Sequence, residues 1–181
     1  MTMIGRIKAG EGTLIGNAGE YYVVAELLKR GIIAALAPRN APAFDILATS
    51  PIKTVRIRVK TKSEAYTDWQ WVVKKDGSIF RYLQQAEDFT VMVNLTTETK
   101  NMDYFIMPTT VLNSWLINDF QMWVSTPGKR GQQRSATNTK RNLSYSIYKE
   151  RLSAYRNNWD LLWQETSKPS IPVAFQSESE E

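Results

Sequence analysis

The residues available for chemistry in this chain of 181 amino acids are carboxylates, lysines, arginines and hydroxyls, because the sequence contains no His and no Cys. Their absence excludes an imidazole base, a thiolate nucleophile, a disulfide framework and a zinc site of Cys and His ligands. A Mg²⁺ site held by carboxylates is not excluded, since hard cations prefer oxygen ligands. Any catalytic chemistry must therefore come from acidic and basic side chains.

The most regular pattern of such side chains lies in residues 54–63, where apolar and charged residues alternate. In a strand this period of two sorts side chains between two faces. One face would carry Val55, Ile57, Val59 and Thr61, and the other Arg56, Arg58, Lys60 and Lys62. Nothing in the strand neutralises the four cations, so either solvent or an anionic partner must face them.

The elements that position these residues begin with a helix over residues 16–30, predicted from an apolar stripe and from Gly31 as its stop. Two short extended segments, 32–37 and 43–48, follow it and precede the alternating strand. Glu20 would lie near the start of the helix and Asp45 in the second extended segment.

The rest of the chain predicts further strands, helices and one polar segment. The strands are 69–73, 89–95 and 104–107; the helices are 78–87, a short one at 111–116 and a closing one at 145–162; the loop is 126–142. We interpret most of the six tryptophans as core residues, and Trp159 and Trp163, which are four apart, would share a helix face.

The order of these elements, with GNAGEYY in the helix, PAFDIL at the second strand and RIRVKTKS in the third, resembles the PD-(D/E)XK nuclease family. FTVMVNL and DYFIMPTTVL resemble the strands that follow in some branches, so the likeness covers residues 14–112. It implies an α/β fold: a restriction-endonuclease-like αβββαβ core with a mixed central sheet flanked by helices. A basic C-terminal extension would be added to that core.

The resemblance also implies a catalytic site of Glu20, Asp45, Lys60 and Arg58. Mg²⁺ or Mn²⁺ would be held by Glu20, Asp45 and the carbonyl of Val59. The cation would activate water, and Lys60 would orient that water or stabilise the transition state. The cofactor and the divalent-metal-dependent DNA endonuclease activity are both expectations from the family.

Arg58 departs from the family pattern, which has an acidic residue or glutamine two positions before the lysine. A guanidinium cannot coordinate a cation and repels one nearby. Arg58 would either grip a phosphate beside the scissile one, or mark a domain that binds nucleic acid and no longer cuts. If the family resemblance is set aside, each residue has an ordinary interpretation: Glu20 is a helix-start acid, Asp45 a turn residue and Lys60 a solvated cation.

A second group of cations suggests nucleic-acid binding by the C-terminal third. The net charge is +5, yet residues 126–156 hold eight cations and one anion. Either a phosphate-tracking patch or a solvated loop explains that excess. With the strand face, the candidate nucleic-acid contacts are Arg56, Arg58, Lys62, Lys129, Arg130, Arg134, Lys140 and Arg141.

The length predicts one domain over residues 1–166, with its core at 14–112 and the basic loop and closing helix at 113–166. The acidic tail, 167–181, is expected to be disordered. No run approaches the roughly 20 apolar residues of a membrane span, and the default location is the cytoplasm. The expected partner is DNA, with branched and single-stranded forms and a homodimer left open. The other hypotheses are a nucleic-acid-binding module and a protein-interaction domain.

Overall fold

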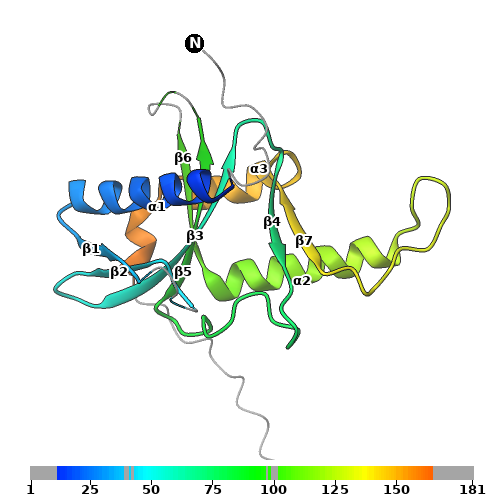
Figure 1. The fold of residues 1–181 in the computed structure, drawn as a ribbon, viewed down its shortest axis with the longest axis horizontal. Coiled ribbons are helices and arrows are strands. Elements are labelled where there is room, and N and C mark those ends of the chain that lie inside the picture. The colour runs from blue at the N-terminus through cyan, green and yellow to red at the C-terminus, as the bar shows by residue number, and fades with distance from the viewer. Residues whose placement is uncertain (1–11, 39–40, 42, 97, 99–101, 165–181) are drawn as a thin grey trace, which may run out of the picture.

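The computed structural model describes residues 12–38, 41, 43–96, 98 and 102–164 (Figure 1). The helices are α1 (Gly12–Lys29), α2 (Thr109–Ser125) and α3 (Tyr145–Leu152), followed by the 3₁₀ helices η2 (Ser153–Tyr155) and η3 (Trp159–Leu162). The strands are β1 (Ile33–Leu36), β2 (Ile46–Thr49), β3 (Thr54–Ser63), β4 (Asp68–Val72), β5 (Asp88–Leu95), β6 (Asp103–Pro108) and β7 (Lys140–Ser144).

Five strands form the central sheet in the order β1-β2-β3-β5-β6. The β3–β5 pair is parallel and the other three pairs are antiparallel, so the sheet is mixed. One hydrophobic cluster joins α1 and η3 to the sheet, and a second joins α2, α3 and the β4–β7 pair to it (Figure 1). The expected α/β class, a mixed sheet flanked by helices, is confirmed.

The helix α1 approaches β3 closely because Gly19 lies against Thr61. A Cβ built on Gly19 would lie 1.9 Å from Thr61 Oγ1 and 3.0 Å from two further atoms of the same side chain. Gly19 is buried, as are Val23 and Leu27 on the same helix. The missing side chain therefore sets the distance between the helix that carries Glu20 and the strand that carries Lys60.

Gly19→Ala is expected to lower the free energy of unfolding by about 1 to 3 kcal/mol, because the added methyl group overpacks a tight contact. The matched control is Gly16→Ala in the same helix, where an added Cβ meets nothing within 4 Å. That control should gain up to about 1 kcal/mol from helix propensity. Urea unfolding of both variants measures the difference, and equal stability would contradict the close contact.

The cationic face of β3 is not left to solvent or to a partner along its whole length. Arg56 donates two hydrogen bonds to the buried carboxylate of Asp88, at 2.7 and 2.9 Å. Lys62 is buried and donates to the Tyr66 carbonyl and to Asn94 Oδ1. The expectation that solvent or an anionic partner faces all four cations is therefore wrong for these two, which hold the fold together.

The expected helix over 78–87 does not form, and turns and bends occupy that segment instead. Asp76 accepts hydrogen bonds from the Ser78 backbone and hydroxyl, and such local bonds compete with a helix. Tyr82 has a positive φ of 62°, which ends any helical run. The apolar residues that suggested a helical period are buried nevertheless, namely Ile79, Phe80 and Leu83.

The C-terminal third also differs from the expectation. A short helix was expected at 111–116, and the structure has the longer α2 there. The expected loop 126–142 ends earlier, because its last residues belong to strand β7. The closing helix stops at Leu152, because Asn157 has a positive φ of 53° and exchanges hydrogen bonds with Tyr104 of β6. Trp159 therefore lies in η3, a 3₁₀ helix that ends before Trp163.

Between α2 and β7 the chain leaves the body of the molecule as a projecting loop (Figure 1). The predicted acidic tail, 167–181, lies outside the described residues. Among the helices of the described part, none is long and apolar enough to cross a membrane.

Candidate functional site

Asp45 is fixed at the point where β2 meets β3. Asp45 was expected within the second strand, but it lies immediately before β2. Its N–H donates to the Ile57 carbonyl at 2.9 Å, and its Oδ2 accepts from the Val59 N–H at 2.7 Å. The Asp45 side chain therefore continues the pairing with β3 just before β2 begins. These two hydrogen bonds hold the carboxylate against β3.

Arg58 reaches the same carboxylate from β3. Its guanidinium Nη1 lies 3.2 Å from Asp45 Oδ1. The Arg58 side chain is 40% exposed, whereas that of Asp45 is 16% exposed. The ion pair thus joins a mostly buried acid to a cation that is free to move toward solvent.

Glu20 completes this group from α1. Glu20, Asp45 and Arg58 line one pocket of about 300 Å³ together with Thr13 and Asn17 of the same helix. Burial raises the pKa of Glu20, the charge of Asp45 raises it further, and Arg58 opposes the shift. The two acids separated by 24 residues of sequence therefore interact electrostatically in the fold.

Asp45 responds to its surroundings in the same direction. Burial raises its pKa, while the Val59 N–H, Arg58 and Lys60 act in the opposite direction. Both carboxylates are thus costly to keep ionised in this fold. Such a cost is typical of groups retained for function, although structural ion pairs also perturb pKa values.

Lys60 lies outside the pocket of the two acids but shares a second pocket with Arg58. This second pocket has a volume of about 280 Å³, and β4 closes it with Trp71. The Lys60 ammonium lies 5.9 Å from the Trp71 ring centroid. Burial lowers its pKa, Arg58 and Lys74 lower it further, and Asp45 opposes them. Arg58 therefore lines both pockets, with the two acids in one and the lysine in the other.

Two residues of this second pocket, Trp71 and Lys74, were missed in the sequence. Trp71 is among the tryptophans interpreted as core residues, and that interpretation does not place it over Lys60. That contact depends on β4 folding back across β3, which no local pattern indicates. Lys74 lies two residues beyond the end of β4, and with Arg81 it brings the cations of the pocket to four.

The oxygen donors of the site suit a magnesium ion. Mg²⁺ is usually bound by one or two carboxylates together with water and substrate phosphates. Glu20 and Asp45 supply the carboxylates. A strand residue directs its N–H and C=O to the same side, so the Val59 carbonyl faces the edge at which its N–H meets Asp45. Among the described residues, no cluster of three or more acidic, His or Cys side chains is found.

The basic residues of the C-terminal third lie on and beside α2. Arg141 stacks on Phe120 at 3.3 Å, and Arg134 stacks on Trp123 at 5.0 Å. Lys129 and Arg130 lie exposed in the projecting loop, and Lys140 is exposed at the start of β7. None of the five forms an ion pair with a carboxylate in the part of the chain that the structure describes.

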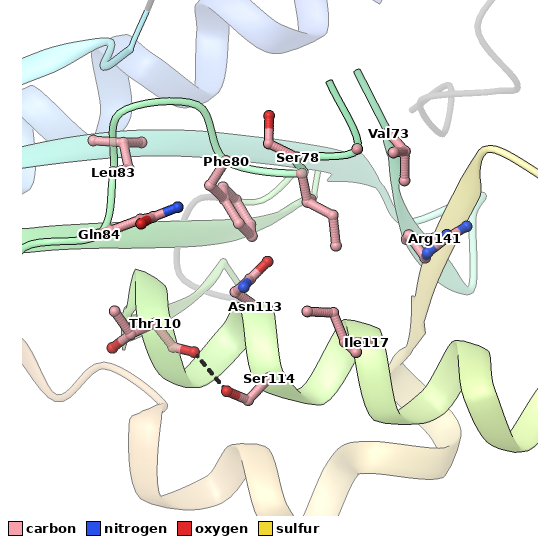
Figure 2. A pocket seen from close by; sticks show the side chains of 12 residues that line it. Val73, Ser78, Phe80, Leu83, Gln84, Thr110, Asn113, Ser114, Ile117 and Arg141 are labelled. Carbon is pink, nitrogen blue, oxygen red and sulfur yellow. Dashed lines mark hydrogen bonds between the residues drawn. The ribbon is translucent and has the colours of Figure 1, made fainter. Parts of the chain in front are cut away.

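A further pocket, of about 430 Å³, lies between residues 73–84 and α2 (Figure 2). Phe80 and Ile117 line its walls with Asn113 between them, and Arg141 closes one end (Figure 2). Its lining includes no carboxylate. It therefore lacks the groups for metal-assisted hydrolysis, and of the predicted site residues it contains Arg141 alone.

No protein-family model matches the chain, and no curated protein matches it in sequence. Among solved structures, it is similar to the bacterial homing endonuclease I-Ssp6803I, with 15% identity and a TM-score of 0.48, over 83% of this chain and 90% of that one. It is also similar to Hjc, a Holliday junction resolvase of the archaeal hyperthermophile Archaeoglobus fulgidus. That match has 15% identity and a TM-score of 0.42, over 72% of this chain and 91% of that one.

Proposed function

We propose that this chain is a divalent-metal-dependent endonuclease that hydrolyses phosphodiester bonds in DNA. The observation that carries the proposal is the grouping of Glu20, Asp45 and Arg58 in one pocket, with Lys60 beside Arg58 in the next. Acids that bind a hard cation and cations that bind phosphate are the two requirements of metal-assisted hydrolysis at a phosphorus centre.

The chain's own residues take separate roles in this proposal. Glu20, Asp45 and the Val59 carbonyl would hold Mg²⁺ or Mn²⁺, which when bound would supply a water of lowered pKa and positive charge for the phosphate. Lys60 is close to Arg58 and Asp45 and stabilises negative charge as water attacks phosphorus and one P–O bond breaks. Trp71 shields that ammonium from part of the solvent.

Arg58 exchanges partners when DNA binds. Its guanidinium holds Asp45 Oδ1 in the free protein, and a phosphate offers it a stronger, forked contact. Release of Asp45 would leave its Oδ1 without the guanidinium and open to another ligand. The basic residues of the C-terminal third track neighbouring phosphates; they are Lys129, Arg130, Arg134, Lys140 and Arg141.

Incubation with supercoiled plasmid, branched junctions and single strands tests this function. We expect cleavage in Mg²⁺ or Mn²⁺, none in EDTA, and a loss of at least about 100-fold in Lys60→Ala. The control is Lys149→Ala, an exposed lysine on α3, which should cleave like the wild type. Equal cleavage by Lys60→Ala and the wild type would remove Lys60 from the site.

The second candidate function is a DNA-binding module without cleavage, and the Arg58–Asp45 ion pair favours it. A guanidinium that stays on Asp45 neutralises the acid and keeps a metal ion away. This candidate predicts salt-dependent binding, with the slope of log K against log salt reporting the phosphate contacts. It also predicts no cleavage of any substrate with any metal ion.

A further inference from the structure

The strands β4 and β7 form a separate two-stranded ribbon whose outer face is uncovered. Five residue pairs join them, from Asp68 with Ser144 to Val72 with Lys140. The inner face carries Trp69, Trp71 and Leu143, all buried in the second hydrophobic cluster. Burial alternates along both strands, so every second side chain points away from the core.

The outer face combines an amide pair with an apolar side chain and a cation. Gln70 and Asn142 are cross-strand partners, and Val72 lies opposite Lys140. All four residues are exposed, with Val72 at 55%. Asp68 at one end is the acid of this face, and it is half-buried.

Gln70 is held in one orientation by its neighbour. Its Nε2 donates to Asn142 Oδ1 at 2.9 Å. The Gln70 amide keeps its second N–H and its carbonyl oxygen, for which no other partner occurs in the described residues. One donor beside one acceptor on a planar amide is the pair that binds the N7 and N6 edge of adenine in the major groove.

The outer face is continuous with the candidate catalytic site. Gln70 and Val72 line the same pocket as Arg58 and Lys60. Lys74, two residues beyond the end of β4, lines it as well. A duplex seated on the ribbon would therefore bring its backbone to the cations at the site while its base edges face the amide pair.

Charge and size also favour a duplex as the occupant. Lys74 and Lys140 make no ion pair with a carboxylate in the described part of the chain, so they remain available for phosphates. The major groove admits a two-stranded ribbon of this kind. The exposed methyl groups of Val72 match the methyl group that thymine presents there.

We propose that the outer face of the β4–β7 ribbon lies in the major groove of duplex DNA, where Gln70, oriented by Asn142, binds an adenine of the target. This inference rests on the proposed function, since it requires that the chain bind DNA. It goes beyond that function by assigning sequence preference to residues outside the catalytic site. Asn142 is a positioning residue, because it acts through the amide of Gln70.

The test is selection of bound sequences from a randomised duplex library, with Ca²⁺ in place of Mg²⁺ to limit cleavage. We expect the wild type to enrich adenine at one position, and Gln70→Ala to lose about tenfold discrimination there. Asn142→Ala should lose it too, whereas Asn142→Asp keeps the acceptor and so keeps the preference at lower affinity. The control is Gln121→Ala, an exposed amide on α2, which should match the wild type.

Lys140→Ala separates base contacts from phosphate contacts on the same face. It should weaken binding to all sequences alike and reduce the salt slope by about 1. Unchanged adenine enrichment in Gln70→Ala, or no enrichment in the wild type, overturns the ribbon inference alone. Absence of any duplex binding at low salt overturns the proposed function, and the ribbon inference with it.

Discussion

Asp45→Asn is expected to reduce DNA cleavage by at least about 100-fold, which is the loss that follows removal of a single preorganised electrostatic contact in other enzymes. The substitution keeps the size of the side chain and an oxygen that can accept from the Val59 N–H, as Asp45 Oδ2 does. It removes the negative charge that would hold a divalent cation. Initial cleavage rates on supercoiled plasmid in Mn²⁺ measure the loss.

The same variant should be no less stable than the wild type at pH 7. Because burial raises the pKa of Asp45, the folded protein holds that proton to a higher pH than the unfolded chain does. The carboxyl group therefore adds stability below its ordinary pKa of about 4, and this contribution is lost as the pH rises through the raised pKa. The Asp45→Asn variant has no ionisable group at this position, so its stability does not fall with rising pH for this reason.

Urea unfolding in EDTA at pH 4 and pH 7 checks this expectation. The wild type should lose more unfolding free energy between the two pH values than Asp45→Asn does. The ion pair with Arg58 contributes little against this difference, because the guanidinium is 40% exposed. Glu20→Gln should behave similarly, and Glu26→Gln serves as its control, since Glu26 on the same helix pairs with Lys29 and Arg30 and does not line the pocket. A variant that loses stability as well as cleavage would indicate a structural role.

Arg58→Glu is the second substitution with a large expected effect, and it acts on metal binding. It places a third carboxylate beside Asp45 and Glu20 and removes the guanidinium that competes for Asp45 Oδ1. We expect the affinity for Mn²⁺ in the absence of DNA to rise at least about tenfold, which isothermal titration calorimetry measures directly.

Arg58→Gln separates the two causes of that rise. It removes the positive charge without adding a ligand, so its affinity should lie between those of the wild type and Arg58→Glu. If all three proteins bind Mn²⁺ equally, the metal is not held in this pocket. Cleavage distinguishes the two candidate functions: new cleavage in Arg58→Glu favours the binding module, and loss of existing cleavage assigns Arg58 a catalytic role.

Much of the fold could be predicted because local patterns carry it. The alternation in β3, the apolar runs of β5 and β6, and the stripe on α1 each gave the correct type of element near its observed bounds. The failures occurred where tertiary contacts override a local period. Residues 78–87 bury Ile79 and Leu83 without a helix, and Asn157 ends the closing helix by bonding to β6.

The sequence by itself determined which chemistry is open to this protein. Without His and Cys, hydrolysis must depend on carboxylates and on lysine or arginine, and the element order placed Glu20, Asp45 and Lys60 on neighbouring elements. Only the tertiary structure decided how the cations of β3 are used. Asp88 neutralises Arg56 and Asn94 accepts from Lys62, each 32 residues away along the chain, and Asp45 holds Arg58 across the β2–β3 pair. The position of the β4–β7 ribbon beside Lys60 is likewise a result of long-range packing, which a local alternation of residues does not encode.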